Sequence, residues 1–280
     1  MYGLIVLVSG FIEKMKVQYN SGRGIEYHLP IGEKLIHMNP LIGKKLRLEH
    51  VGGIECLNCG RATKKSYSQG YCYVCMTTLA RCDSCIMSPE KCHIDKGTCR
   101  EPEWADKFCM TDHIVYLANS SGIKVGITRH NQIPNRWIDQ GAIQALPIFR
   151  VANRKLSGLV EVAFKEFVAD KTNWRKMLKN EVSPLDLYKE KARLIELTKT
   201  SLDNLIDRYG TDSIRLIHDA EVLEFDYPVT EYPSKISSYN LDKSPIVEST
   251  LVGIKGQYLI FEEGVINLRK YTSYNLCLTY

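Results

Sequence analysis

Residues 113–151 read HIVYLANSSGIKVGITRHNQIPNRWIDQGAIQALPIFRV, and this stretch decides the fold of the central part of the chain. The apolar runs HIVYLAN and IKVGIT on either side of Ser-Ser-Gly predict a β-hairpin. We expect a short helix from Pro134 to Gly141, because proline favours the first helical position and glycine favours the end. The run ALPIFRVA at 145–152 predicts a third strand.

The residues after this stretch have the periodicity of a helix. From Lys155 onward, apolar side chains recur three and four positions apart and predict an amphipathic helix. They are Leu156, Leu159, Val160, Ala163, Phe164 and Phe167. The order of elements is therefore β-β-α-β-α. Ser183 and Pro184 fit the N-cap and first position of a longer helix that ends at Gly210.

The rest of the chain predicts an α+β protein in four parts. Residues 1–50 form a small β-rich N-terminal unit of short strands with Gly and Pro turns, and residues 51–110 form a Cys-rich zinc-ribbon module. Residues 111–182 are the ββαβα core, and residues 183–280 hold the long helix and a C-terminal β-rich unit. The two β-rich ends could pair into one barrel-like unit.

Cysteines are crowded into one part of the chain. Nine of the ten fall between Cys56 and Cys109, and only Cys277 lies elsewhere. In CLNCGRATKKSYSQGYCYVC, Cys56 and Cys59 are followed by Cys72 and Cys75. Two C-x-x-C turns at this spacing complete a tetrahedral four-thiolate site. We expect structural zinc there, with an iron–sulfur cluster as the alternative.

A second group of cysteines follows at once and predicts a second zinc ion. Cys82 and Cys85 form one half of this site. The spacing leaves open which residues complete it, and we favour Cys99 with Cys92 or Cys109. The open candidates are Cys92, Cys99, Cys109, His93 and His113. A buried cysteine can also serve as a small apolar side chain.

The composition is that of an ordinary globular protein, with 44% hydrophobic and 25% charged residues. The N-terminal MYGLIVLVSGF has a short apolar run without a preceding cationic region or a cleavage site. It predicts a buried first strand and neither a signal peptide nor a membrane span. We therefore expect a cytoplasmic protein, in which crowded cysteines bind metal and do not form disulfides.

Positive charge is concentrated in residues 121–155. This segment has a single acidic residue, Asp139, and six cationic ones: Lys124, Arg129, Arg136, Arg150, Arg154 and Lys155. Such a segment attracts polyanions, although a solvated basic face would have the same composition. The first cysteine ribbon adds cations beside tyrosines, a combination that suits phosphate contact with base stacking. These residues are Arg61, Lys64, Lys65, Tyr67, Tyr71 and Tyr73.

Residues 113–168 resemble the core of the GIY-YIG nucleases. Ile114-Val115-Tyr116 stands at the first tyrosine motif of that family, and Lys124-Val125-Gly126 stands at the second. Arg136 lies where the family has its arginine, and Glu161 lies where it has its metal-binding glutamate. Asn173 could match a later asparagine.

The resemblance implies roles for these residues. Tyr116 would act as base, Arg136 would contact the phosphate, and Glu161 would hold Mg²⁺ or Mn²⁺ for phosphodiester hydrolysis. Gly126 would let the backbone approach the phosphate. Two departures count against catalysis: Lys124 replaces the second tyrosine, and Asp139 and Gln140 occupy the turn after Arg136. Lys124 could still bind phosphate as a point charge.

Nearly the whole chain also resembles an uncharacterised prokaryotic family, domain of unknown function 2797. The stretches that carry this resemblance include CGRATKKSYSQGYCYVC, CREPEW, VYLANSSGIKVGITR, RWIDQGAIQALPI, DKTNWRKML and GIKGQYLIF. It implies no established activity.

Three functions follow from these patterns. The first is a zinc-stabilised nucleic-acid-binding protein on a degenerate GIY-YIG-like fold with weak or no cleavage, whose partner is RNA or DNA with a slight preference for structured or single-stranded RNA. The second is an active divalent-metal-dependent endonuclease. The third is a zinc scaffold for protein partners. The alternative to catalytic roles for these residues is a purely structural one, in which Tyr116 is a core aromatic side chain and Glu161 pairs with Lys165 one helical turn away.

Overall fold

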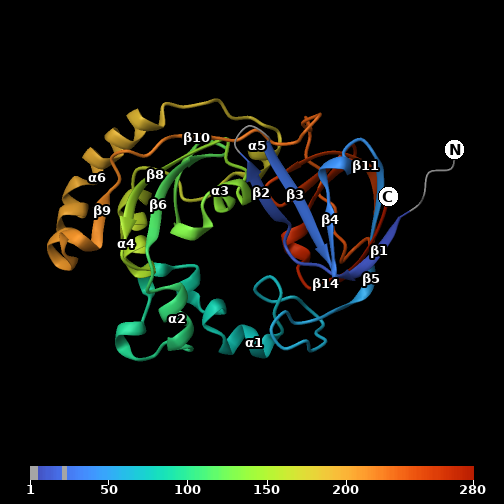
Figure 1. Ribbon diagram of the computed structural model, residues 1–280, viewed down its shortest axis with the longest axis horizontal. Helices are drawn as coiled ribbons and strands as arrows, with labels where there is room; N and C mark the ends of the chain where they lie inside the picture. The colour runs from blue at the N-terminus through green and yellow to red at the C-terminus, as the bar shows by residue number, and fades with distance from the viewer. Residues whose placement is uncertain (1–5, 21–23) are drawn as a thin grey trace. The chain divides into compact units, whose positions relative to one another are not determined.

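The computed structural model describes residues 6–20 and 24–280. The chain forms two compact units, which Figure 1 shows coloured along the sequence. Unit 1 comprises Met1–Thr77, Leu178–Asn180 and Asp226–Tyr280, and unit 2 comprises Thr78–Met177 and Glu181–Phe225. The boundary between them falls inside the expected Cys-rich module, so the two groups of cysteines lie in different units.

Unit 1 is built on strands from both ends of the chain. Its six-stranded sheet has the order β1-β14-β5-β11-β12-β13. The strands are β1 (Leu7–Phe11), β5 (Lys45–Ile54), β11 (Ile246–Lys255), β12 (Tyr258–Phe261), β13 (Gly264–Asn267) and β14 (Tyr274–Thr279). A separate three-stranded sheet contains β2 (Lys16–Asn20), β3 (Gly24–Ile31) and β4 (Lys34–His37). The expected N- and C-terminal β-rich parts are therefore one unit.

The pairing of the chain ends follows from alternating apolar side chains. Val8 lies opposite Leu278 in the β1–β14 pair, and Leu48 lies opposite Leu278 in the β14–β5 pair. All three side chains are buried. Successive residues of a strand point to opposite faces, so this register places one apolar face in the core. The part of the expected first strand before residue 6 lies outside the described residues.

Unit 2 contains an antiparallel sheet of order β10-β8-β6-β7, in which β9 also pairs with β8. Its strands are β6 (His113–Asn119), β7 (Ile123–Arg129), β8 (Gln144–Val151), β9 (Ile214–Leu216) and β10 (Leu223–Glu224). The predicted hairpin and third strand are confirmed. β6 is central and fully buried, with Tyr116 opposite Gly126 on β7.

Helices of unit 2 complete its core. The amphipathic helix predicted after Lys155 is α4 (Arg154–Lys165), and the Asn153 side chain caps it by accepting a hydrogen bond from the backbone N–H of Leu156 at 3.0 Å. Leu156, Val160 and Phe164 of α4 pack against the buried β6 residues Val115 and Leu117. α3 (Asn135–Asp139) lies between β7 and β8 in the chain, as predicted.

The long helix α6 (Leu187–Tyr209) begins later than Ser183, so the predicted start is wrong. The side chain of Asn119 donates to the carbonyl of Ser183, and the N–H of Leu185 donates to Gln144. These bonds hold residues 183–185 outside the helix, and Asp186 caps it through the N–H of Lys189 at 3.0 Å. The predicted end at Gly210 is confirmed.

The remaining helices are short. They are α1 (Tyr73–Thr78), α2 (Pro102–Phe108) and α5 (Trp174–Leu178), with 3₁₀ turns at Asn39–Leu41, Ala80–Cys82, Ser84–Ile86, Pro89–Lys91, Ile94–Lys96, His130–Gln132, Thr211–Ser213 and Leu268–Tyr271. Across the described part of the chain, no helix has both the length and the apolar character needed to cross a bilayer.

Candidate metal centres and phosphate-binding site

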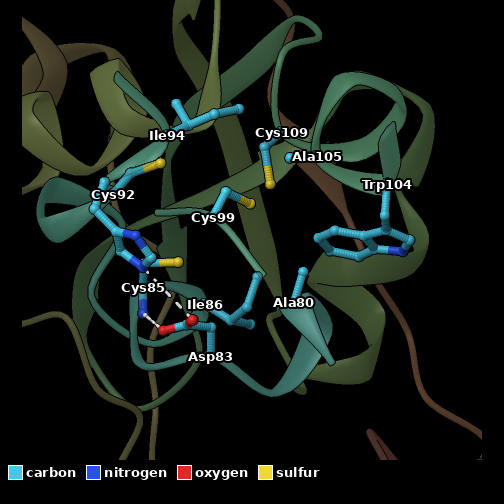
Figure 2. A pocket seen from close by; sticks show the side chains of 11 residues that line it. Ala80, Asp83, Cys85, Ile86, Cys92, Ile94, Cys99, Trp104, Ala105 and Cys109 are labelled. Carbon is cyan, nitrogen blue, oxygen red and sulfur yellow. Dashed lines mark hydrogen bonds and ion pairs between the residues drawn. The ribbon is translucent and has the colours of Figure 1, made fainter. Parts of the chain in front are cut away.

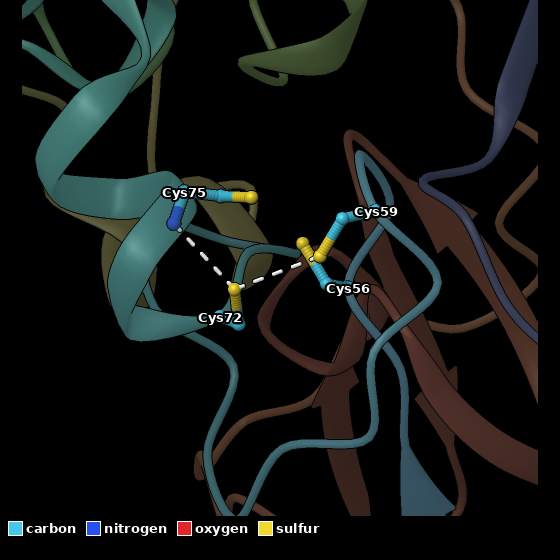
Figure 3. A group of neighbouring side chains, drawn as sticks. All are labelled: Cys56, Cys59, Cys72 and Cys75. Atoms are coloured by element: carbon cyan, nitrogen blue, oxygen red, sulfur yellow. Dashed lines mark hydrogen bonds between the residues drawn. The ribbon is translucent and has the colours of Figure 1, made fainter.

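The first cysteine group lies in unit 1, directly after β5. Cys56 and Cys59 come from one turn, and Cys72 and Cys75 come from the start of α1 (Figure 3). The four sulfur atoms all lie within 4.8 Å of one another, and the sulfurs of Cys59 and Cys72 are 3.8 Å apart. Tetrahedral zinc with bonds of about 2.3 Å requires sulfur separations of about 3.8 Å. The group therefore suits a single tetrahedral metal ion.

Polar groups around these sulfurs favour negative charge on them. The N–H of Cys75 donates to the Cys72 sulfur and the side chain of Asn58 donates to the Cys75 sulfur, both at 3.5 Å. The pKa of the Cys56 thiol is lowered to about 6. Burial alone would raise this pKa, but hydrogen bonds from the backbone of Cys72, Cys59 and Asn58 together have the larger effect. Burial and the neighbouring thiols raise the pKa of Cys75. Four thiolates this close need a cation among them.

The second cysteine group lies in unit 2. Cys85, Cys92, Cys99 and Cys109 line one small cavity together with Asp83, His93 and apolar side chains (Figure 2). Cys82 is not among the lining residues, so the structure brings together four of the five cysteines predicted for this site. Within the described chain, no three of these four sulfurs lie mutually within 4.8 Å. The arrangement is therefore wider than that of the first group.

Asp83 and His93 lie at the edge of the second group, near Cys85. The Asp83 carboxylate accepts from Arg100 at 2.8 Å and also caps the turn that contains Cys85. The His93 ring is 3.5 Å from Asp83 through Nε2 and 2.8 Å from the Thr98 hydroxyl through Nδ1. The Asp83 carboxylate and the Nδ1 atom of His93 therefore already have partners within the protein.

His113 was the other open histidine candidate. It is buried on β6, where burial lowers its pKa to about 4, and its Nδ1 lies 2.7 Å from the Thr111 carbonyl. It does not line the cavity of the second group.

Arg154 supplies positive charge close to the second group. Its guanidinium donates to the carbonyl of Ile86 at 2.6 Å, and its Nε has no hydrogen-bond partner among the described residues. Burial lowers the pKa of Arg154, whereas the negative charge of Cys109 and Cys85 raises it. A half-buried cation thus lies beside the cysteines.

Two of the predicted site residues, Tyr116 and Lys124, converge on one amide in unit 2. Lys124 Nζ donates to Gln140 Oε1 at 2.7 Å, and the Tyr116 hydroxyl donates to the same oxygen at 3.0 Å. Tyr116 is fully buried and Lys124 is only 4% exposed. Burial raises the pKa of Tyr116, while burial and the charge of Arg136 lower the pKa of Lys124 to about 8. The tyrosine therefore stays protonated.

Arg136 and Glu161 lie next to this network. Arg136 is half-buried, and its positive charge acts to lower the pKa of Tyr116 against the larger effect of burial. Glu161 is buried on α4, where burial raises its pKa, and its carboxylate lies 3.4 Å from Lys165 Nζ. Lys165 also pairs with Asp170 at 3.2 Å. Glu161 is therefore buried and paired with a cation.

Gly126, Arg129 and Asn173 take separate positions around the hairpin. Gly126 is buried opposite Tyr116, and the half-buried Arg129 lies over the Phe108 ring, 4.9 Å from its centroid. The backbone N–H of Asn173 donates to the Ser121 hydroxyl, and its side chain caps the start of α5. Asn173 thus has a structural role at that helix.

The basic segment 121–155 carries less free charge than its sequence suggests. Arg150 pairs with Asp112, Lys155 pairs with Asp95, and Arg154 is half-buried beside the cysteines. These partners come from distant parts of the sequence, so composition could not reveal them. Arg129 and Arg136 remain as the half-buried cations of this segment that have no ion pair among the described residues.

The basic residues of the first ribbon lie in unit 1. Arg61, Lys64 and Lys65 are exposed, and the Lys65 ammonium lies 5.5 Å from the centre of the Tyr67 ring. Tyr73 packs edge-on against Tyr67 and is 60% exposed. Cations and an accessible aromatic surface therefore occur together at this tip.

Two residues of these sites were not predicted. Gln140 follows Arg136 by four positions, a spacing that places both on one face of a helix and could have indicated the contact. Arg154 gave no such signal, because its relation to Cys85 and Cys109 depends on tertiary packing.

Comparison with known protein families gives one match. The family model described as "Protein of unknown function (DUF2797)" matches residues 43–276, which is more than half of the chain. The chain belongs to this family. The DUF2797 match begins after β4 and includes both cysteine groups and the Tyr116–Gln140 network. No curated protein and no solved structure matches the chain.

Proposed function

We propose that this DUF2797 protein binds nucleic acid through the phosphate backbone and cleaves it weakly or not at all. Its ββαβα core would be a GIY-YIG-like fold, with Arg136 and Arg129 at the phosphate-binding surface and Lys124 supporting it from within. A zinc ion at Cys56, Cys59, Cys72 and Cys75 would order the ribbon of unit 1.

The shared acceptor Gln140 Oε1 carries this proposal. It binds both the Tyr116 hydroxyl and the Lys124 ammonium, and both side chains are buried. A general base must reach the proton that it removes and must itself be deprotonated. A buried Tyr116 with a raised pKa meets neither condition. The cations that would bind phosphate, Arg136 and Arg129, are thus present, whereas Tyr116 is unsuited to act as the general base.

The environment of Glu161 supports the same conclusion. A divalent cation at this carboxylate would have to displace the Lys165 ammonium, 3.4 Å away. Burial also favours the protonated form of Glu161, which binds metal poorly. An active endonuclease would require Glu161 to separate from Lys165 and Tyr116 to become exposed.

The ribbon tip favours RNA over duplex DNA as the partner. Tyr73 offers an accessible ring beside Tyr67, and Lys65 lies over Tyr67. Stacking on aromatic side chains needs unpaired bases, which structured and single-stranded RNA supply. The tip would then bind unpaired bases of RNA by stacking.

A binding and cleavage assay on the same protein tests this function. Fluorescence anisotropy with a labelled single-stranded RNA should give an affinity that falls steeply as salt increases, because each phosphate contact releases counterions. Incubation of the same RNA with Mg²⁺ or Mn²⁺ should leave it nearly intact.

Two results would overturn the proposal. RNA and DNA binding that is absent at low salt would exclude the nucleic-acid function. Rapid cleavage that Glu161→Gln abolishes would instead establish the endonuclease. If the wild type and Glu161→Gln both cleave rapidly, the assignment of this core to a GIY-YIG-like site is wrong.

A further inference from the structure

The four cysteines of unit 2 surround their cavity from separate segments. Cys85 follows Asp83 in the turn before Pro89–Lys91, Cys92 and Cys99 flank the turn Ile94–Lys96, and Cys109 follows α2. Figure 2 shows their sulfur atoms around a common space. Side chains that converge from four places in this way indicate a bound group between them.

The spacing of these sulfurs does not suit a single zinc ion. Four ligands of one tetrahedral zinc lie about 3.8 Å apart, and in the first group all four sulfurs lie within 4.8 Å of one another. Across the part of the chain that the structure describes, the second group contains no set of three sulfurs mutually within 4.8 Å. An iron–sulfur cluster shares its four cysteine sulfurs among two or four irons, so no three of these sulfurs surround a single metal atom.

We propose that Cys85, Cys92, Cys99 and Cys109 bind an iron–sulfur cluster, in place of the second zinc ion expected from the sequence. Each cysteine supplies one thiolate to an iron. Cys82 lies outside this ligand set. The two cysteine groups of the chain then differ in the metal that they take, zinc in unit 1 and iron with sulfide in unit 2.

The lining of the cavity suits such a cluster. Ile86, Ile94, Trp104 and Ala105 provide an apolar wall. A cluster with four thiolates carries net negative charge, and exclusion of water together with nearby positive charge stabilises it. The half-buried Arg154, whose Nε is buried and has no other partner among the described residues, supplies that charge.

A mononuclear metal held by Asp83, Cys85 and His93 is the competing arrangement. These three residues lie within 4.8 Å of one another. The carboxylate is already bonded to Arg100 and the Ser84 hydroxyl, and the Cys92, Cys99 and Cys109 thiols would have no role in such a site. The competing arrangement therefore leaves three converging cysteines unexplained.

The cluster would stabilise the packing of the loops that carry these four cysteines against the core of unit 2. The first N–H of α4, from Arg154, donates to the carbonyl of Cys109 at 2.8 Å. A Cβ on Gly158 of α4 would lie 2.5 Å from the backbone nitrogen of Glu90, so the loop between Cys85 and Cys92 packs directly on this helix. The role inferred is structural and needs no electron transfer.

Metal and sulfide analysis of the full chain, purified without oxygen, tests this inference. We expect about one zinc per chain together with iron and acid-labile sulfide in equal amounts, about two or four of each. The protein should be brown with a broad visible absorption that bleaches in air. If the isolated protein lacks iron, incubation with iron and sulfide without oxygen should restore this absorption.

Matched variants assign the ligands. Cys99→Ala and Cys109→Ala should lose most of the iron and sulfide and keep the zinc, whereas Cys82→Ala and His93→Gln should keep all three. These readouts involve no nucleic acid, so their outcome is independent of the proposed function.

Three results would overturn the inference. One is two zinc ions per chain without sulfide under anaerobic conditions. Another is a wild-type protein that takes up no cluster on incubation with iron and sulfide. The third is loss of the metal in His93→Gln while Cys99→Ala and Cys109→Ala retain it, which would establish the mononuclear site.

Discussion

Tyr116 and Gly126 face each other across the β6–β7 hairpin so closely that a Cβ on residue 126 would lie 2.7 Å from the Tyr116 hydroxyl. The glycine therefore lets the Tyr116 ring lie flat against β7 and reach Gln140. In the GIY-YIG resemblance this glycine would make room for a phosphate. In this protein it makes room for the tyrosine.

Gly126→Ala should destabilise the protein by about 1–3 kcal/mol, because the new methyl group overpacks a full core. Urea denaturation measures this loss. The double variant Gly126→Ala/Tyr116→Ala should lose less stability than the sum of the losses in the two single variants, because the ring that clashes with the new methyl group is absent. Additive losses would show that the two residues do not compete for this space.

Gln140→Leu should destabilise the protein by about 2 kcal/mol, because it leaves two buried donors, the Tyr116 hydroxyl and the Lys124 ammonium, without their acceptor. Gln140→Glu is the matched control. Its carboxylate can accept both hydrogen bonds and compensates the charge of Lys124, so its loss should be smaller. Equal melting temperatures for the wild type and Gln140→Leu would contradict the shared-acceptor network.

Cys56→Ser should remove the zinc of unit 1 and cause aggregation or unfolding, because the short ribbon after β5 depends on metal binding for much of its folding free energy. Cys277→Ser is the control, since Cys277 on β14 lies in neither cysteine group. Elemental analysis and circular dichroism measure the two effects. A soluble, zinc-free Cys56→Ser protein with the wild-type melting temperature would show that the metal is dispensable.

Stability should depend on pH through Lys255 in unit 1. This side chain is fully buried, donates to Asn180 at 2.8 Å and lies near the rings of Tyr227 and Tyr232. Burial lowers its pKa to about 8, below the unfolded value of about 10.4. The unfolded chain therefore binds more protons between these values, and stability rises with pH there.

The measurement compares the wild type with Lys255→Met. Between pH 7.5 and 9, the free energy of unfolding of the wild type should rise by about 1 kcal/mol relative to the variant. Groups common to both proteins, Lys124 included, cancel in this difference. A difference that is flat with pH would mean that Lys255 titrates at its ordinary pKa in the folded protein.

Local sequence patterns predicted the parts of this protein that depend on near neighbours. The spacing of Cys56, Cys59, Cys72 and Cys75 indicated the first cysteine group, because each C-x-x-C turn positions its own two sulfurs. Alternation and helical periodicity predicted the β6–β7 hairpin and α4. These signals need only a few adjacent residues.

Features that depend on distant residues could not be predicted. Asn119 and Gln144 hold residues 183–185 outside α6, so the Ser-Pro signal placed its start too early. The sequence predicted a second group of cysteines, but the exclusion of Cys82 from the cavity depends on tertiary packing. The ion pairs of Arg150 and Lys155 likewise join segments that no local pattern relates.

The salt dependence of RNA binding in Arg136→Ala tests the central claim most directly. Arg193 on α6 pairs with Glu190 and provides the control variant, Arg193→Ala. If Arg136 contacts a phosphate, its loss should weaken binding several-fold and make the slope of log affinity against log salt shallower by about one, while Arg193→Ala leaves both unchanged. Equal affinities and slopes for the two variants, or an affinity that does not change with salt, would contradict the account.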